Sequence, residues 1–144
     1  MSNNVSHLNQ LWTDIYYLLR YKHKEKVTHI GVRIMQIIEK EREVGIQDIA
    51  RVMDISPNTA SEHVKRLTEK KYVYKTRSDE DERKVIVKLT DVGADVLHLN
   101  SSLDEGKLTG IFAQASTKEQ EAIIQSFQLL KELAKKNEEQ EQID

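Results

Sequence analysis

The chain has 144 residues, and 24 Asp and Glu outnumber 22 Lys and Arg, which gives a formal net charge of −2 at pH 7. This length suffices for one domain with its own hydrophobic core, and the slightly acidic balance excludes a general nucleic-acid coat protein. No apolar run is long enough to cross a bilayer and no signal peptide is found, so we expect a cytoplasmic protein with no membrane partner.

Two amphipathic helices are predicted in the first 40 residues. Apolar residues recur at spacings of three and four over residues 5–24, which predicts a first helix there. The residues of this stripe are Val5, Leu8, Trp12, Ile15 and Leu19. A second helix, which leads into the next segment, is indicated by Ile30, Ile34, Met35, Ile37 and Ile38.

Residues 46–70 are predicted to form two helices joined by a tight turn. Gly45 permits the backbone turn before the first of them, whose apolar side consists of Ile49, Ala50, Val52 and Met53. The second helix should begin at Pro57, because Ser56 can accept backbone N–H bonds as an N-cap and proline has the φ angle of a first helical residue. Its inward stripe is Ala60, Val64 and Leu67.

The outer faces of this second helix carry short polar and cationic side chains. They are Asn58, Thr59, Ser61, Glu62, His63, Lys65 and Arg66. Hydroxyl and amide groups near a helix N-terminus can reach base edges, and Lys or Arg one turn later can meet phosphates. A solvated surface helix would show the same polarity, so this face alone leaves both interpretations open.

Two short strands, at about residues 72–77 and 84–89, are predicted next from alternating patterns with high β propensity. A polar loop of hairpin length joins them into a wing, whose cations are Arg77, Arg83 and Lys84. Arginine is drawn to the negative potential of a narrow minor groove, so such a wing can contact the minor groove or the DNA backbone. Residues 56–84 have a net charge of +2, against −4 for the rest of the chain, and this is the sign that a DNA-binding site requires.

Residues 91–136 are again predicted to be helical. Thr90 can cap a helix whose apolar stripe is Val92, Val96, Leu99 and Leu103, and two later glycines, Gly106 and Gly110, weaken this helix without setting a clear end. Overlapping capping boxes that begin at Ser116 and Thr117 predict a last helix. Its apolar face is Ile123, Ile124, Phe127, Leu130 and Leu133. We expect the acidic tail, residues 137–144, to be frayed.

Two short motifs in the wing and after it carry a family resemblance. They are Asp-x-Arg at Asp81–Arg83 and Leu-Thr-x-x-Gly at Leu89–Gly93. Together with the helix that starts at Pro57, they resemble the MarR family of bacterial transcription regulators. The resemblance implies one domain over residues 1–144, mainly α with a small β wing. Its winged helix-turn-helix would span residues 46–90, with the helices at about 46–70 and the wing at about 72–89.

The resemblance also implies a function. The chain would be a sequence-specific regulator of transcription, most often a repressor, whose homodimer binds double-stranded DNA at a pseudo-palindromic operator. Residues 1–40 and 91–136 would form the dimer, because their apolar stripes lack partner surface within one chain; a monomer whose helices fold back on the module is the alternative. Recognition helix 57–70 would enter the major groove, and wing 77–84 would contact the minor groove or the backbone.

Within the wing, the resemblance implies that Arg83 enters the minor groove and that Asp81 orients it. The expected DNA-contacting residues are Ser56, Asn58, Thr59, Ser61, Glu62, His63, Lys65, Arg66, Arg77, Asp81, Arg83 and Lys84. Glu62 either accepts from a cytosine amino group or forms a helix-surface pair with Arg66 four residues later.

The chain departs from the family pattern at two places. Lys71 stands where members commonly have a glycine in the left-handed conformation, which costs a non-glycine residue on the order of 1 kcal/mol. The wing tip is also unusually acidic, with Asp79, Glu80, Asp81 and Glu82 in a row. These carboxylates repel phosphate, so we expect a short contacting wing, and they favour the alternative of a winged-helix module that docks a protein partner.

The remaining candidate sites concern small molecules. Trp12, Tyr16, Tyr17 and Arg33 could line a crevice for a small aromatic or anionic effector of the kind that the resembled family accepts, although an aromatic stripe at helical spacing is more often core. The chain has five histidines and no cysteine, and no two histidines stand four apart on one helix, so we expect no metal site and no cofactor. No nucleophile-base arrangement or phosphate-binding glycine loop is found, so we expect no enzyme.

Overall fold

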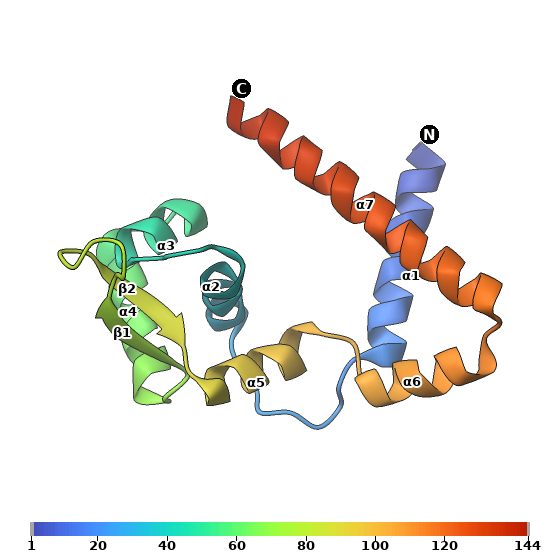
Figure 1. Cartoon of the computed structure of the whole chain (residues 1–144), viewed down its shortest axis with the longest axis horizontal. Helices are drawn as coiled ribbons and strands as arrows, with labels where there is room; N and C mark the ends of the chain where they lie inside the picture. The colour runs from blue at the N-terminus through green and yellow to red at the C-terminus, as the bar shows by residue number, and fades with distance from the viewer. Residues whose placement is uncertain (1, 144) are drawn as a thin grey trace. The chain divides into compact units, whose positions relative to one another are not determined.

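The computed structural model describes residues 2–143 and consists mainly of helices, with one two-stranded sheet (Figure 1). The predicted fold class, mainly α with a small β wing, is therefore confirmed. In chain order the elements are α1 (Ser2–Leu19), α2 (His29–Lys40), α3 (Ile46–Met53), α4 (Pro57–Glu69), β1 (Val73–Arg77), β2 (Val85–Leu89), α5 (Asp91–Ser101), α6 (Glu105–Gln114) and α7 (Thr117–Ile143). The chain divides into two compact units, Met1–Asp104 and Glu105–Asp144.

The core of the first unit is built around α2, which packs against α3, α4, α5 and β2. Its largest fully buried side chains are Ile34, Met35, Ile49, Val64, Val73 and Leu97. Each such side chain stabilises the fold by about 1.5–3 kcal/mol relative to an exposed position. The helix-turn-helix and the wing therefore share a single core and are held as one body.

Three helices of this unit begin where a hydroxyl group caps them. Thr28 precedes α2, Ser56 precedes α4 and Thr90 precedes α5, and each side-chain oxygen accepts the backbone N–H three residues later. Such a cap is worth about 1 kcal/mol. The caps at Ser56 and Thr90 are the ones that the sequence predicts, and Pro57 is the first residue of α4 as expected.

The two strands form an antiparallel wing in which Val73 lies opposite Leu89 and Arg77 lies opposite Val85. A further residue joins this sheet from the segment before α3, because the Val87 N–H donates to the Val44 carbonyl oxygen at 2.7 Å. The loop between α2 and α3 is thereby attached to strand β2 of the wing.

The first helix is shorter than the predicted span of residues 5–24, since α1 ends at Leu19. The reason is a long-range backbone pairing. Arg20 forms an antiparallel bridge with Leu103, and the Leu19 carbonyl oxygen accepts the Asp104 N–H at 2.6 Å. An extended segment that pairs across the unit cannot also continue the helix.

The same pairing ends α5 at Ser101, so the chain leaves the helix before both glycines that the sequence marks as weak points, and α6 begins at Glu105. In the second unit, the helix α7 continues through Ile143. The tail that was predicted to be frayed, residues 137–144, is helical in the structure up to Ile143, and Asp144 lies outside the described residues.

Of the two predicted capping boxes before α7, the one at Ser116 is present. The Ser116 N–H donates to Glu119 Oε1 at 2.9 Å, and the Glu119 N–H donates to Ser116 Oγ at 3.1 Å. The hydrogen bond from the Ser116 backbone also holds the pKa of Glu119 below its ordinary value. The start of this long helix is therefore capped as the local sequence predicts.

Candidate nucleic-acid interface

On helix α4, the residues that the sequence places on the outer faces lie toward solvent. Exposed side chains are Asn58, Thr59, Glu62, Lys65 and Arg66, and half-buried ones are Ser61 and His63. The inward stripe of Ala60, Val64 and Leu67 is buried as predicted. A polar surface of amides, hydroxyls and cations is thus held on a rigid helix.

The polar contacts of α4 fix part of this surface. The Ser56 hydroxyl accepts the Thr59 N–H at 3.1 Å and donates to Thr59 Oγ1 at 2.9 Å, so it orients the side chain of Thr59 while capping the helix. Arg66 Nη1 lies 3.4 Å from His63 Nδ1. No ion pair joins Arg66 to Glu62 in the part of the chain that the structure describes, and the Glu62 carboxylate remains exposed.

Helix α4 ends in a left-handed turn at Lys71, whose φ of 65° is the conformation that the family resemblance implies for this position. The Lys71 N–H donates to the Thr68 carbonyl oxygen at 2.9 Å, and the Tyr72 N–H donates to the Leu67 carbonyl oxygen at 3.0 Å. This pair of bonds is a Schellman motif, which satisfies the last carbonyl groups of the helix. The turn has the usual shape despite the missing glycine, and the strain stays at Lys71.

Thr90 ties this turn to the start of α5. Its N–H donates to the Tyr72 carbonyl oxygen at 2.9 Å, and its hydroxyl donates to the Lys71 carbonyl oxygen at 2.6 Å. Gly93 lies so close that a Cβ at this position would stand 1.9 Å from the Tyr72 carbonyl oxygen. The Leu-Thr-x-x-Gly motif therefore has a packing role: it locks the end of α4 to the start of α5.

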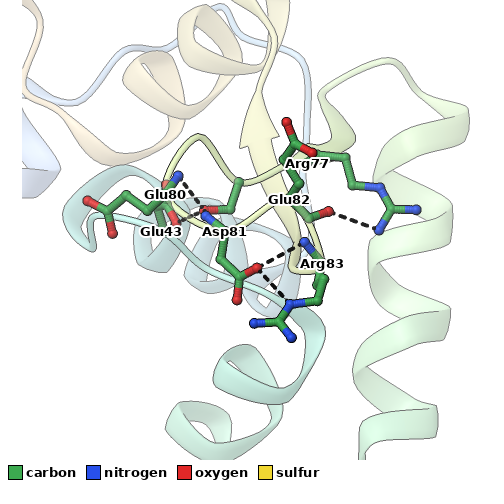
Figure 2. Close-up of polar contacts among 7 residues, drawn as sticks. Glu43, Arg77, Glu80, Asp81, Glu82 and Arg83 are labelled. Atoms are coloured by element: carbon green, nitrogen blue, oxygen red, sulfur yellow. Dashed lines mark hydrogen bonds and ion pairs between the residues drawn. The ribbon is translucent and has the colours of Figure 1, made fainter.

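The wing loop presents Arg83 on a hydrogen-bonded support (Figure 2). One carboxylate oxygen of Asp81, Oδ1, accepts both the Arg83 backbone N–H at 3.1 Å and the Arg83 Nε–H at 3.3 Å. The Arg83 side chain is 92% exposed, so it is held near its base and open to solvent at its tip. Arg77 Nη1 donates to the Glu82 carbonyl oxygen at 3.4 Å, and Lys84 is also exposed.

The loop is anchored from inside by Ser78, which is only 2% exposed. Its hydroxyl donates to Glu43 Oε2 at 2.6 Å and accepts the N–H groups of Glu80 and Asp81 at 3.1 and 3.2 Å. A second contact, the ion pair of Arg42 with Glu80, joins the same two loops. The acidic wing tip is thus partly neutralised by the protein itself.

Sequence reasoning missed these anchors. For Ser78 a signal existed, because a serine hydroxyl often accepts the N–H groups two and three residues later in a turn. Glu43 lies 35 residues before Ser78, and nothing in the local sequence of either residue indicates their contact.

Helix α3 begins with a carboxylate cap that the sequence analysis also missed. Asp48 Oδ2 accepts the Gly45 N–H at 2.9 Å, and Asp48 Oδ1 accepts from Arg51 at 2.9 Å. The backbone hydrogen bond from Gly45 is the main cause that lowers the pKa of Asp48, and the bond from Arg51 adds to it. The charged form of this aspartate therefore supports the first helix of the helix-turn-helix.

The four candidate effector residues are only partly brought together. Trp12 and Tyr16 stack with ring centroids 6.4 Å apart, and the Tyr16 hydroxyl donates to the Asn100 carbonyl oxygen at 3.3 Å. Tyr17 is exposed beneath the guanidinium of Arg20. Arg33 is exposed on α2, and within residues 2–143 no hydrogen bond or ion pair joins it to these rings.

The described residues include no group of three His, Cys, Asp or Glu side chains placed to hold a metal ion. Within the same residues, no helix combines the length and the apolar character needed to cross a membrane.

Comparisons with known proteins place the chain among regulators. It is 27% identical over 79 residues to the HTH-type transcriptional regulator SarZ of Staphylococcus epidermidis, which covers 55% of this chain and 53% of that protein. It is 29% identical over 76 residues to SarZ of Staphylococcus haemolyticus, covering 53% and 52%. The chain thus spans about half the length of the curated relatives it matches.

Solved structures agree on the fold. The structure of MepR from S. aureus bound to ethidium bromide is similar with a TM-score of 0.60 and 18% identity, over 93% of this chain and 94% of that one. RV1404 from Mycobacterium tuberculosis gives a TM-score of 0.65 and 16% identity, over 91% and 90%. At sequence level, the family model described as transcriptional regulator SarA/Rot matches residues 16–99, more than half of the chain. The chain belongs to the SarA/Rot family of transcriptional regulators, whose winged helix-turn-helix is similar to that of the MarR family.

Proposed function

We propose that the chain is a sequence-specific DNA-binding repressor of transcription that acts as a homodimer. One observation carries the proposal: the module that exposes the polar face of α4 also holds Arg83 outward on the wing through Asp81. A solvated surface helix has no need of an adjacent arginine held in this way. DNA-binding winged helices use such a pair, with a helix for the major groove and a wing for the minor groove or backbone.

Base reading is assigned to the first turns of α4. Asn58 and Thr59 are exposed beside the helix N-terminus, where short side chains reach base edges, and Ser56 orients the Thr59 hydroxyl. Lys65 and Arg66, two turns later, are exposed and would contact phosphates. Arg83 would add the wing contact, so affinity would come from a few placed cations in a chain of net charge −2.

Exposed apolar side chains at both ends of the chain support the homodimer. On α1, Leu8 is 50% exposed and Trp12 48% exposed. On α7, Phe127 is 45% exposed and Leu133 53% exposed. Apolar surface of this extent on two helices is usually covered by a partner, and a two-fold copy would present two recognition helices to half-sites about one DNA turn apart. Light scattering on the purified protein tests this, and a monomer at micromolar concentration would contradict it.

An effector site is proposed beside the stacked rings of Trp12 and Tyr16, with Tyr17 and Arg33 as further candidates, for a small aromatic or anionic molecule. Trp12 is the only tryptophan in the chain, so its fluorescence reports on this position. A titration with benzoate, a small aromatic anion, should change that fluorescence saturably. A linear or absent response to this probe would count against a site for small aromatic anions.

Selection of bound duplexes from a random DNA pool tests the function as a whole. A regulator should enrich one pseudo-palindromic sequence, and its affinity for that sequence should fall steeply with salt. The acidic wing tip favours a second candidate, a winged-helix module that binds a protein partner. In that case the pool would yield no enriched sequence and only weak binding.

A further inference from the structure

A series of hydrogen bonds leads from Glu43, in the loop between α2 and α3, through the Ser78 hydroxyl and the backbone N–H of Asp81 to the wing arginine (Figure 2). We propose that Glu43 is a positioning residue for Arg83, which sets the wing for DNA without touching DNA itself. This inference rests on the proposed function, because it concerns the contact that Arg83 makes with DNA.

The first link joins Glu43 to Ser78. Glu43 Oε2 accepts the Ser78 hydroxyl hydrogen at 2.6 Å, and Ser78 is almost completely buried. A hydrogen bond to a charged acceptor at this distance is among the stronger ones in proteins. Because the hydroxyl hydrogen is committed to Glu43, the lone pairs of Ser78 Oγ are turned toward the wing loop.

The second link joins Ser78 to Arg83 through Asp81. Ser78 Oγ accepts the N–H of Asp81 at 3.2 Å, which fixes the backbone of Asp81, and Asp81 Oδ1 accepts from Arg83 twice. Loss of the Glu43 acceptor would free the Ser78 hydroxyl to rotate and loosen this turn. The guanidinium would then sample more positions, and the cost of ordering it on DNA would rise.

The loop also holds the wing at two further places. Arg42 forms an ion pair with Glu80, and Val44 pairs with Val87 on β2. The ion pair is exposed and worth little by itself, whereas the backbone pairing keeps the strand in place when a side chain is removed. A Glu43 variant should therefore keep its fold and lose mainly the order of the loop tip.

A charge effect and a positioning effect predict opposite changes in DNA affinity for the same substitution. Removing a carboxylate from a DNA-binding module should strengthen binding, because one negative charge no longer repels phosphate. Loss of a positioning residue should weaken binding. Glu43→Ala therefore separates the two effects by the direction of the change alone.

The experiment measures affinity for the duplex that the wild-type protein selects from a random pool. Glu43→Ala should bind this duplex about 3- to 30-fold more weakly, whereas in an Arg83→Ala background it should have no further effect, because the two residues act through one contact. Glu43→Gln keeps an oxygen acceptor for Ser78 and should recover most of the affinity. Glu41→Ala is the matched control, since it removes the same charge from an exposed position in the same loop and should not weaken binding.

Thermal unfolding and footprinting separate positioning from a general loss of structure. The melting temperature of Glu43→Ala should stay close to that of Glu43→Gln, and protection of guanine N7 in the major groove should persist while protection in the minor groove is lost. Equal or stronger binding by Glu43→Ala, or a loss that adds fully to that of Arg83→Ala, would overturn the inference. If the wild-type protein selects no sequence, or Arg83→Ala binds normally, the proposed function or its wing contact has failed instead.

Discussion

Replacing Gly93 with alanine should destabilise the fold, although alanine is the better helix former. A Cβ at this position would lie 1.9 Å from the carbonyl oxygen and 2.7 Å from the carbonyl carbon of Tyr72. Both are backbone atoms, and they belong to the turn that Thr90 holds by a hydrogen bond of 2.9 Å. The new methyl group cannot be accommodated by the rotation of a neighbouring side chain, so α5 must move away from the end of α4.

Three energy contributions decide whether Gly93→Ala stabilises or destabilises the fold. Alanine in place of glycine inside a helix is worth about 1 kcal/mol in its favour. Forcing a methyl group into a filled space costs about 3 kcal/mol when backbone has to shift. Displacing the Tyr72 carbonyl from Thr90 loses a hydrogen bond of about 1 kcal/mol. The clash outweighs the propensity, and we expect the free energy of unfolding to fall by about 2–4 kcal/mol.

Guanidinium unfolding followed by circular dichroism measures this at one fixed protein concentration, because the stability of the proposed homodimer would depend on concentration. The melting temperature should fall by roughly 2–4 °C for each kcal/mol at this chain length. Gly110→Ala is the matched control, because among the described residues no atom outside the adjoining backbone of α6 lies within 4 Å of the new methyl group, and α6 should gain up to about 1 kcal/mol. If Gly93→Ala were as stable as the wild-type protein, the packing role assigned to this glycine would be refuted.

Three further predictions concern the turn, the cap and the DNA contacts. Lys71→Gly should raise the free energy of chemical unfolding by about 1 kcal/mol, because it removes the strain at φ 65°. The control Lys70→Gly removes the same charge at φ −79° and should lower the free energy of unfolding. Equal effects of the two substitutions would contradict the strain argument. The lowered pKa of Asp48 means that its stabilising contribution is complete above the ordinary value of 3.8 and is lost as the pH falls through the lower pKa of the folded state. The stability difference between wild type and Asp48→Asn should thus be constant near neutral pH and shrink below 3.8, and a difference that persists in strong acid would refute this. In DNA-binding assays, Arg83→Ala should weaken binding to all sequences. Asn58→Ala should instead change which sequence is preferred, by lowering the discrimination between bases by about 1–3 kcal/mol per lost base contact. Uniform weakening by both substitutions would show that Asn58 reads no base.

Local signals predicted the helix-turn-helix well because its boundaries are set by neighbouring residues. Ser56 and Pro57 start α4 through a cap and a fixed φ angle, and Lys71 ends it in the left-handed turn. Hydrophobic periodicity then identified the buried stripe of α4. Such features need only a few consecutive residues, so a single sequence is sufficient to find them.

Long-range contacts account for what the sequence analysis missed. The ends of α1 and α5 follow from the pairing of Arg20 with Leu103, and neither residue carries a local sign of it. The contact between Glu43 and Ser78 likewise joins two loops across the module. For the acidic wing tip, the sequence indicated repulsion of phosphate, and the family resemblance implied that Asp81 orients Arg83. In the structure Asp81 Oδ1 does accept from Arg83, whereas the pairing of Glu80 with Arg42 was not predicted.

The contact between Thr90 and the turn after α4 has a mechanical consequence. The Tyr72 carbonyl oxygen accepts hydrogen bonds from both the N–H and the hydroxyl of Thr90, and Gly93 fills the space beside it. The end of α4 and the start of α5 are therefore held rigidly together. A displacement of α5 would therefore carry the end of α4 with it, so the orientation of α4 would change while its internal hydrogen bonds stay intact.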